Sequence, residues 1–206
     1  SERIHKFCFD LAVRRSAKLG VPQSVTCVDK SNVLRGCQFF RSIFREIAES
    51  YPKIGAKEAY IDAFTMWLVR DPEDLDVVVL PNMFGDIATD LASVLQGGMG
   101  MAASANLGDK HMMFEPVHGS SPKHAGKNRV NPIAMLSSLQ LMLENLSLRH
   151  DDPLLDKYGN ILQQAISQHL SSDGPKTYDI GGTGTTSEVG DAIADRVRRL
   201  LRNDKA

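Results

Sequence analysis

Short apolar runs that alternate with longer amphipathic segments are the feature that most limits how this chain can fold. The continuous run Val77-Val78-Val79-Leu80 is typical of a strand buried on both faces. We expect two more short strands at residues 24–28 and 58–61. The predicted helices, recognised by apolar residues at helical spacing, run from an N-cap at Ser1 to Gly20 and over 39–47, 63–69, 83–95, 132–146, 152–170 and 187–201. This alternation indicates an α/β fold with a parallel or mixed sheet flanked by helices.

A glycine-rich stretch at 97–100 interrupts the pattern near the middle of the 206 residues. Such a stretch favours a flexible junction, and a chain of this length suffices for one large domain or two modest ones. We therefore expect one domain over 1–96 and a second over 97–206. Residues 114–121, rich in Pro, His, Gly and Ser, are predicted to form a loop.

Composition and charge argue against several classes of partner. The formal net charge is −1, so no excess of positive charge predicts binding to nucleic acid or to an anionic membrane. A solvated helix face explains the four arginines between 196 and 202. The three cysteines lack metal-ligand spacing and are odd in number, which favours a reducing, cytoplasmic compartment. No run approaches the roughly 20 apolar residues of a membrane span, and no signal-peptide pattern is present.

Asp86 and Asp90 are candidate metal ligands because they stand four residues apart in a predicted helix. They would project from one helix face, where two like charges are unfavourable without a cation between them. Mg²⁺ and Mn²⁺ prefer such oxygen ligands. The alternative is a solvent-facing acidic pair. The buried strand just before this helix favours the metal, since ligand sites in α/β proteins form at the carboxyl ends of strands.

Asp62 and Lys30 also follow predicted strands. Asp62, taken alone, fits the N-cap of the next helix. Lys30 is either a surface residue or, beside a metal ion and an acidic substrate, a group that transfers a proton, since neighbouring cations favour the neutral form of a lysine.

The segment EPVHGSSPKHAGKNRVNP, at 115–132, combines small residues, hydroxyls, imidazoles and cations. Small residues allow backbone N–H groups to approach a pyrophosphate, so this segment is either an anion-binding loop or an ordinary surface turn. A G-x-G-x-x-G fingerprint after a strand is absent, which argues against an ordinary Rossmann site.

Together these segments resemble the isocitrate and isopropylmalate dehydrogenase family of metal-dependent β-decarboxylating dehydrogenases. The resemblance covers nearly the whole chain and rests on five motifs in the family's order. They are VDKSNVL at 28–34, YIDAFTMWLV at 60–69, NMFGDIATDLAS at 82–93, GGMGMAASANLG at 97–108 and the 115–132 loop. It implies the fold of that family, with 1–96 in the smaller, dimer-forming domain and 97–206 in the cofactor-binding domain.

The resemblance also implies roles for individual residues. Lys30 would be the catalytic lysine, with Asn32 beside it, and would act in the partner subunit's active site. Asp62 would serve catalysis as a metal ligand donated across a homodimer, while Asp86 and Asp90 bind Mg²⁺ or Mn²⁺ from their own subunit. The dinucleotide would be held by His118, Gly119, Ser120, Lys123, His124, Asn131 and Tyr178, with Asn131 reading adenine.

The implied reaction oxidises a 2-hydroxy di- or tricarboxylic acid by hydride transfer to NAD(P) and then releases CO₂. Members that use NAD typically carry an acidic residue after HGxxP, whereas this chain has Lys123 and His124 there. A cation attracts a 2′-phosphate, and Tyr178 resembles a phosphate-contacting tyrosine, so NADP is favoured over NAD. The arginine expected four residues after Tyr178 is absent, because residue 182 is Gly.

The sequence does not fix the substrate. The first candidate is 3-isopropylmalate and the second is isocitrate; the substrates of the homoisocitrate and tartrate or malate branches are further alternatives. Ser120 favours the isopropylmalate side, because isocitrate enzymes usually have Thr there. The resemblance begins nearly halfway along the family's length, so we expect a chain that is incomplete at its N-terminus and inactive alone. Two other hypotheses are a non-catalytic regulatory subunit and a metal- or phosphate-binding module; Lys30 and the three aspartates argue against the first.

Overall fold

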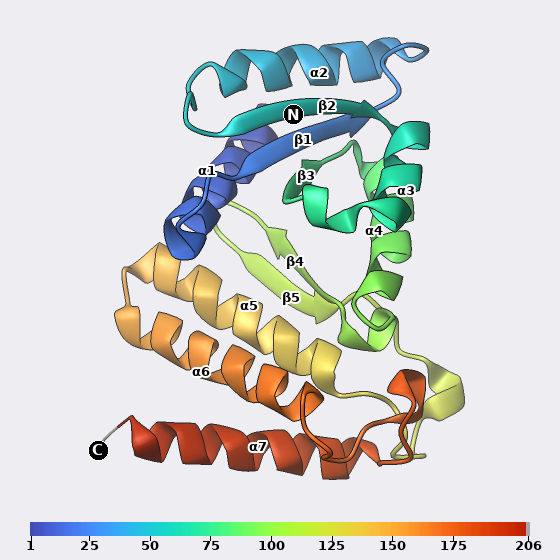
Figure 1. The fold of residues 1–206 in the computed structure, drawn as a ribbon, viewed down its shortest axis with the longest axis vertical. Helices are drawn as coiled ribbons and strands as arrows, with labels where there is room; N and C mark the ends of the chain where they lie inside the picture. Colours follow the sequence, from blue (N-terminus) through green and yellow to red (C-terminus); the bar gives the residue numbers. More distant parts are fainter. Residues whose placement is uncertain (205–206) are drawn as a thin grey trace. The chain divides into compact units, whose positions relative to one another are not determined.

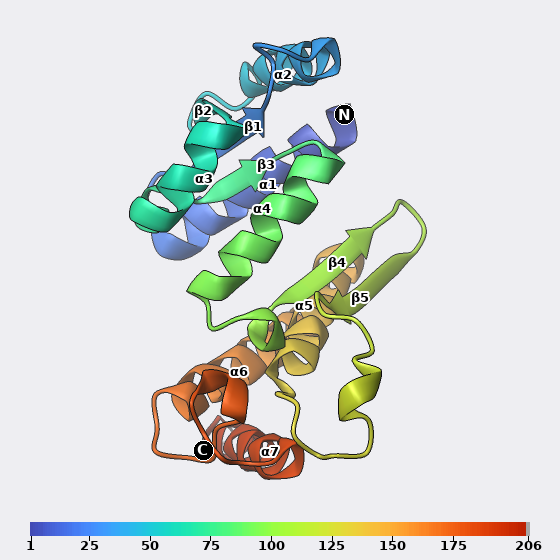
Figure 2. The same cartoon turned by 90° about the vertical axis from the view of Figure 1, so that its right-hand side faces the viewer.

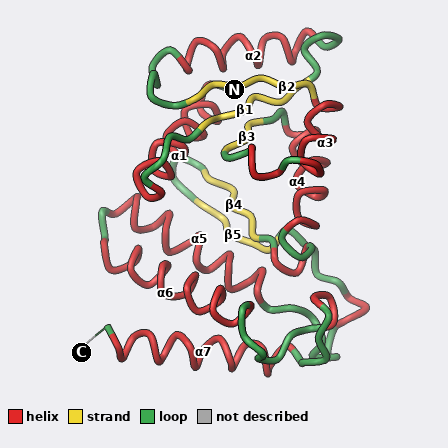
Figure 3. Tube along the Cα trace, in the orientation of Figure 1, coloured by secondary structure: helices red, strands yellow, loops and turns green. Residues whose placement is uncertain are grey.

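The computed structural model describes residues 1–204, and the chain divides into two compact units, Ser1–Ala92 and Ser93 onward. The sequence predicted the division a few residues later, between Gln96 and Gly97. Each unit contains both strands and helices, so the predicted α/β class is confirmed (Figure 1, Figure 3). The roles of the units as dimer-forming and cofactor-binding domains remain predictions.

A three-stranded parallel sheet, in the order β2-β1-β3, is the centre of unit 1 (Figure 2). Its strands are β1 (Ser24–Asp29), β2 (Gly55–Tyr60) and β3 (Val77–Val79). Successive residues of a strand point to opposite faces, and β1 follows this rule: Val25 and Cys27 join one apolar cluster, whereas Val28 joins another. The sheet is therefore buried on both faces, as the apolar run in β3 predicted.

Helices supply the two layers that cover this sheet. They are α1 (Glu2–Leu19), α2 (Arg35–Ala48), α3 (Ile61–Arg70) and α4 (Asn82–Leu95), with a short 3-10 turn at Pro72–Asp74. On one face α1 and α2 pack through Phe9 and Phe44, whose rings are 5.3 Å apart. On the other, Phe64 of α3 and Ala88 of α4 lie in the second cluster. Gly20 ends α1 in the left-handed conformation (φ 71°), as predicted.

Unit 2 combines an antiparallel hairpin with three long helices (Figure 1). Its elements are β4 (Ala103–Leu107), β5 (Met112–Pro116), α5 (Ile133–His150), α6 (Pro153–Leu170), α7 (Thr186–Asn203) and 3-10 turns at Met99–Met101, Pro122–His124 and Tyr178–Ile180. The apolar core joins α5, α6 and α7 through Ile133, Leu162, Ala165, Ile166, Val189 and Ile193. Thr185 and Glu188 form a capping box at the start of α7, which fixes that end of the helix.

Three local predictions were wrong. The hairpin β4–β5 was not predicted, and β5 takes up the first residues of the expected 114–121 loop. The second strand begins at Gly55, not at Glu58. Tyr60, in an extended conformation, occupies the N-cap of α3, so Asp62 lies inside the first helical turn and is not the N-cap. Within residues 1–204, no helix is both long and apolar enough to cross a bilayer.

Candidate functional site

Lys30 and Asp62 meet at the carboxyl ends of β1 and β2 in unit 1. These strands stay in register to their last residues, where Asp29 pairs with Tyr60, so the residues that follow leave the sheet side by side. Lys30 Nζ donates a hydrogen bond of 2.5 Å to Asp62 Oδ1, and this bond lowers the pKa of Asp62 below its ordinary value. The Asp62 side chain is 67% exposed, so the pair is open to a ligand.

A buried ion pair holds the backbone that presents Lys30. The Asp29 carboxylate is fully buried and accepts two hydrogen bonds from Arg41, at 2.9 and 2.7 Å, and one from the Ser31 N–H at 2.7 Å. Arg41 also donates to the Ala59 carbonyl at 3.0 Å and lies over the Tyr60 ring at 5.0 Å. The ends of β1 and β2 are thus tied together next to the lysine.

Asp86 and Asp90 lie one turn apart on α4, and both are exposed. Their spacing therefore offers two carboxylates to solvent on one helix face, as predicted. In the part of the chain that the structure describes, no three side chains of the metal-binding types come together as a ligand set. Asp62 pairs with Lys30 and does not complete a trio with Asp86 and Asp90. Two carboxylates fit a hard divalent cation whose other ligands come from substrate, water or a second chain.

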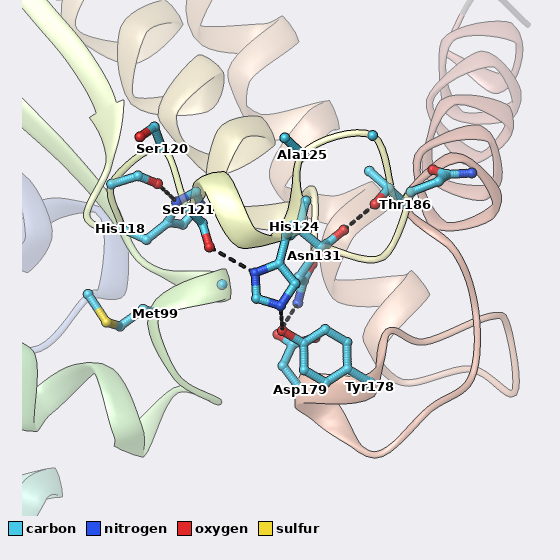
Figure 4. Close-up of a pocket in the computed structure, with 15 residues that line it drawn as sticks. Met99, His118, Ser120, Ser121, His124, Ala125, Asn131, Tyr178, Asp179 and Thr186 are labelled. Carbon is cyan, nitrogen blue, oxygen red and sulfur yellow. Dashed lines mark hydrogen bonds between the residues drawn. The ribbon is translucent and has the colours of Figure 1, made fainter.

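A pocket of about 520 Å³ in unit 2 brings together the residues of the predicted phosphate loop (Figure 4). Its volume is in the range of small-molecule sites. It is lined by the turn before β4, by the loop 118–131, by the turn at 178–179 and by the start of α7. Six of the seven predicted dinucleotide contacts lie in its wall: His118, Gly119, Ser120, His124, Asn131 and Tyr178. Lys123 is on the same loop but outside the lining.

His124 and Tyr178 lie next to each other in the lining of this pocket (Figure 4). Their rings are nearly parallel, 6.2 Å apart, and the Tyr178 hydroxyl lies 3.5 Å from His124 Nε2. The other imidazole nitrogen, Nδ1, is 2.9 Å from the Ser121 hydroxyl. Both ring nitrogens of His124 therefore have a polar neighbour, which fixes the plane of the imidazole.

Asn131 lines the pocket and is almost fully buried. Its side-chain nitrogen donates to Asp179 Oδ2 at 3.0 Å, and its side-chain oxygen accepts from the Ile133 N–H at 3.0 Å. Both ends of the side-chain amide are thus already hydrogen-bonded within the protein. Gly100 allows this arrangement, because a Cβ there would lie 2.6 Å from the Asp179 carboxylate.

The sequence did not reveal the residues that hold the loop in place. Asn128, in the left-handed conformation (φ 51°), accepts at its carbonyl from the Thr186 N–H and at its side-chain oxygen from Ser187. The Thr186 hydroxyl donates to the Val130 carbonyl at 2.6 Å. The sequence signal was the asparagine itself, two residues after Gly126, because asparagine tolerates the left-handed conformation.

Comparison with known proteins assigns the family. Residues 1–193 match the model described as isocitrate/isopropylmalate dehydrogenase. The chain is 43% identical to the 3-isopropylmalate/3-methylmalate dehydrogenase of Methanocaldococcus jannaschii over 96% of its own length and 57% of that protein. It is 38% identical to the homoisocitrate dehydrogenase of the same organism, covering 98% of this chain and 54% of that one. The chain belongs to the isocitrate/isopropylmalate dehydrogenase family.

Solved structures agree with this assignment. A β-decarboxylating dehydrogenase from Thermococcus kodakarensis superposes with a TM-score of 0.85 at 38% identity, over the whole of this chain and 57% of that one. An isocitrate dehydrogenase from Methylococcus capsulatus gives 0.83 at 35% identity, over 96% and 56%. The predicted fold family is confirmed, and the chain spans little more than half the length of these relatives.

Proposed function

We propose that this chain is part of a metal- and NAD(P)-dependent β-decarboxylating dehydrogenase that acts on a 2-hydroxy di- or tricarboxylic acid, with 3-isopropylmalate as first candidate. The contact between Lys30 and Asp62, in a unit that also exposes the carboxylates of Asp86 and Asp90 on one helix, is the observation that carries the proposal. The names of the relatives add support, because they include 3-isopropylmalate and homoisocitrate dehydrogenases. Isocitrate is the second candidate substrate.

The chain's own residues suit a proton transfer coupled to oxidation. Lys30 Nζ, in its uncharged amine form, would accept the proton of the substrate hydroxyl as the hydride leaves the carbon that bears this hydroxyl for nicotinamide. The Asp62 carboxylate, which accepts a hydrogen bond from Nζ, would hold the lysine at that position. Asp86 and Asp90 would hold Mg²⁺ or Mn²⁺, whose chemistry is to polarise the hydroxyl and stabilise the negative charge left when CO₂ departs.

For the nucleotide, we propose NADP in preference to NAD, bound in the pocket of unit 2. Lys123 places positive charge on the loop 118–131, and His124 and Tyr178 add an imidazole and a hydroxyl to the pocket lining. Asn131 would meet the adenine with its backbone, because its side-chain amide is engaged elsewhere.

A homodimer with shared active sites is the assembly we propose. One face of α4 exposes large apolar side chains at helical spacing, namely Met83, Ile87, Leu91, Val94 and Leu95. Contiguous apolar surface of this kind marks an interaction site. A second copy would bury this face. Its Asp62 would then reach the Asp86–Asp90 pair and supply the third carboxylate ligand. The cytoplasmic location predicted from the cysteines agrees with three free, buried thiols.

The decisive experiment measures turnover of the full-length protein with 3-isopropylmalate, homoisocitrate or isocitrate, Mn²⁺ and either nucleotide, following absorbance at 340 nm and CO₂ release. Lys30→Met should lower kcat by about 10²–10⁴-fold, the usual contribution of a general base. Lys53→Met removes an equal charge from an exposed loop of the same unit and is the matched control. Turnover of none of these acids, or equal activity of both variants, would refute the proposal and favour the regulatory-subunit alternative.

A further inference from the structure

Arg129 is the one cation of the loop 118–131 that contacts an aromatic ring at the pocket. Its guanidinium carbon lies 4.8 Å from the centre of the Tyr178 ring. The same ring is stacked with His124, whose Nε2 lies 3.5 Å from the Tyr178 hydroxyl. The guanidinium of Arg129 and the imidazole of His124 thus both contact the Tyr178 ring, which lines the pocket, although Arg129 itself lies outside the lining.

No carboxylate compensates the charge of Arg129. Within residues 1–204, its guanidinium takes part in no ion pair and no hydrogen bond. Asp179, an acidic residue of the pocket lining, accepts a hydrogen bond from Asn131 and forms no ion pair with Arg129. Arginine keeps its charge at all working pH values and presents a planar fork of N–H donors that matches phosphate oxygens. The free donors of Arg129 therefore suit an anionic ligand.

The backbone on both sides of Arg129 is fixed. Asn128 is bonded to the start of α7 through its carbonyl and its side chain, and the Val130 carbonyl accepts from Thr186. These ties join segments 56 to 59 residues apart in the sequence. Arg129 therefore lies between two residues, Asn128 and Val130, that are both hydrogen-bonded to α7. Little backbone entropy is lost when such a residue binds a ligand.

The turn after Tyr178 cannot supply a cation in place of Arg129. A Cβ at Gly182 would lie 2.0 Å from the Lys176 carbonyl oxygen, much closer than atoms tolerate. The Gly182 N–H donates to the Thr177 carbonyl at 2.9 Å, which closes this turn tightly. A side chain at position 182 is therefore excluded, whereas Arg129 reaches the Tyr178 ring from the loop 118–131.

We propose that Arg129 is a specificity-determining residue that binds the 2′-phosphate of NADP, with the Tyr178 hydroxyl and His124 as its partners. This inference rests on the proposed nucleotide site and names the residue that separates NADP from NAD. A phosphomonoester dianion takes charge-assisted hydrogen bonds from a guanidinium, and NAD carries a neutral ribose hydroxyl at the same place.

The test measures binding of 2′-AMP, 5′-AMP and inorganic phosphate to the full-length protein by calorimetry, without any hydroxyacid. Arg129→Gln should raise the Kd of 2′-AMP by about 10- to 100-fold, the loss expected for a hydrogen bond to a charged group, and leave that of 5′-AMP within about two-fold. Arg129→Lys should recover part of the loss, because it keeps the charge and loses the fork. Lys127→Gln, an equal charge change in the same loop, should leave both nucleotides unchanged.

In turnover, Arg129→Gln should raise KM for NADP and leave kcat and KM for NAD unaltered. Equal weakening of 2′-AMP and 5′-AMP would show that Arg129 only packs against Tyr178 and would overturn the inference. Inorganic phosphate that competes as strongly as 2′-AMP would also overturn it, because the site would then hold a free anion. Selective loss of 2′-AMP in a protein that oxidises none of the hydroxyacids would uphold the subsite and refute the proposed function.

Discussion

Replacing Arg41 by methionine should destabilise unit 1 far more than its partly exposed position suggests. The substitution removes both hydrogen bonds that Arg41 donates to the fully buried Asp29 carboxylate and leaves the Ser31 N–H as the remaining close donor. Breaking a buried ion pair by deleting one partner costs about 3–5 kcal/mol, because the other charge stays buried without compensation. We expect the free energy of unfolding to fall by about this amount.

Arg45→Met is the matched control for this experiment. Arg45 also binds a carboxylate with two hydrogen bonds, to Glu58 at 2.6 and 2.8 Å, but its side chain is 64% exposed. Solvent screens such a pair, so its loss should cost only about 0–1 kcal/mol. The double variant Asp29→Asn with Arg41→Met removes the buried charge, keeps an oxygen for the Ser31 N–H, and should regain at least half of the lost stability.

Tryptophan fluorescence during urea unfolding reports on unit 1, because the single tryptophan, Trp67, lies in α3. With a slope of about 2 kcal/mol per molar urea, the Arg41→Met midpoint should fall by roughly 2 M. A loss no larger than that of Arg45→Met would refute the reasoning. The reasoning would also fail if the double variant lost as much stability as Asp29→Asn and Arg41→Met lose separately when added together, because the cost would then not come from the unpaired charge.

The remaining predictions concern metal binding, thiols and pH. Asp86→Asn should weaken Mn²⁺ binding about ten-fold or more in an EPR titration, since it removes a charged oxygen ligand, while Asp173→Asn on an exposed turn should not. Burial raises the pKa of Cys8 to about 11 and of Cys27 to about 12, so mass spectrometry should detect alkylation of both thiols only in urea. Burial lowers the pKa of His5 below 6.5. Below that pH the unfolded chain binds a proton that the folded chain does not, so stability should fall as pH drops, and His5→Gln should flatten the profile.

The long helices were predictable from sequence because their apolar residues recur at helical spacing over many turns. The hairpin β4–β5 was not. Residues 103–107, Ala-Ser-Ala-Asn-Leu, are too small and polar to show the alternation of a half-buried strand, and Pro116 ends the partner strand. Their pairing is fixed by α5, which packs against both strands. Strands of this kind are specified by tertiary contacts more than by their own composition.

Sequence spacing placed Lys30 and Asp62 at strand ends, but it could not show that the two side chains touch. That contact depends on the register in which Asp29 pairs with Tyr60, a relation between segments about thirty residues apart. Arg41 did leave a signal: it stands four residues after Cys37 and three before Phe44, both buried residues of α2. A charged residue on the buried face of a helix implies a buried partner.

The phosphate loop shows how far composition alone can lead. Its glycines, hydroxyls and cations predicted a site for an anion, yet the shape of the loop depends on left-handed backbone at Ser121, Gly126 and Asn128. At Asn128 and Val130 the loop is held by hydrogen bonds to α7, which begins at Thr186. The loop residues therefore supply the chemical groups of the site, whereas contacts with α7 fix the conformation of the loop. It follows that a substitution at Thr186, a residue without charge, should disturb nucleotide binding through the loop it holds.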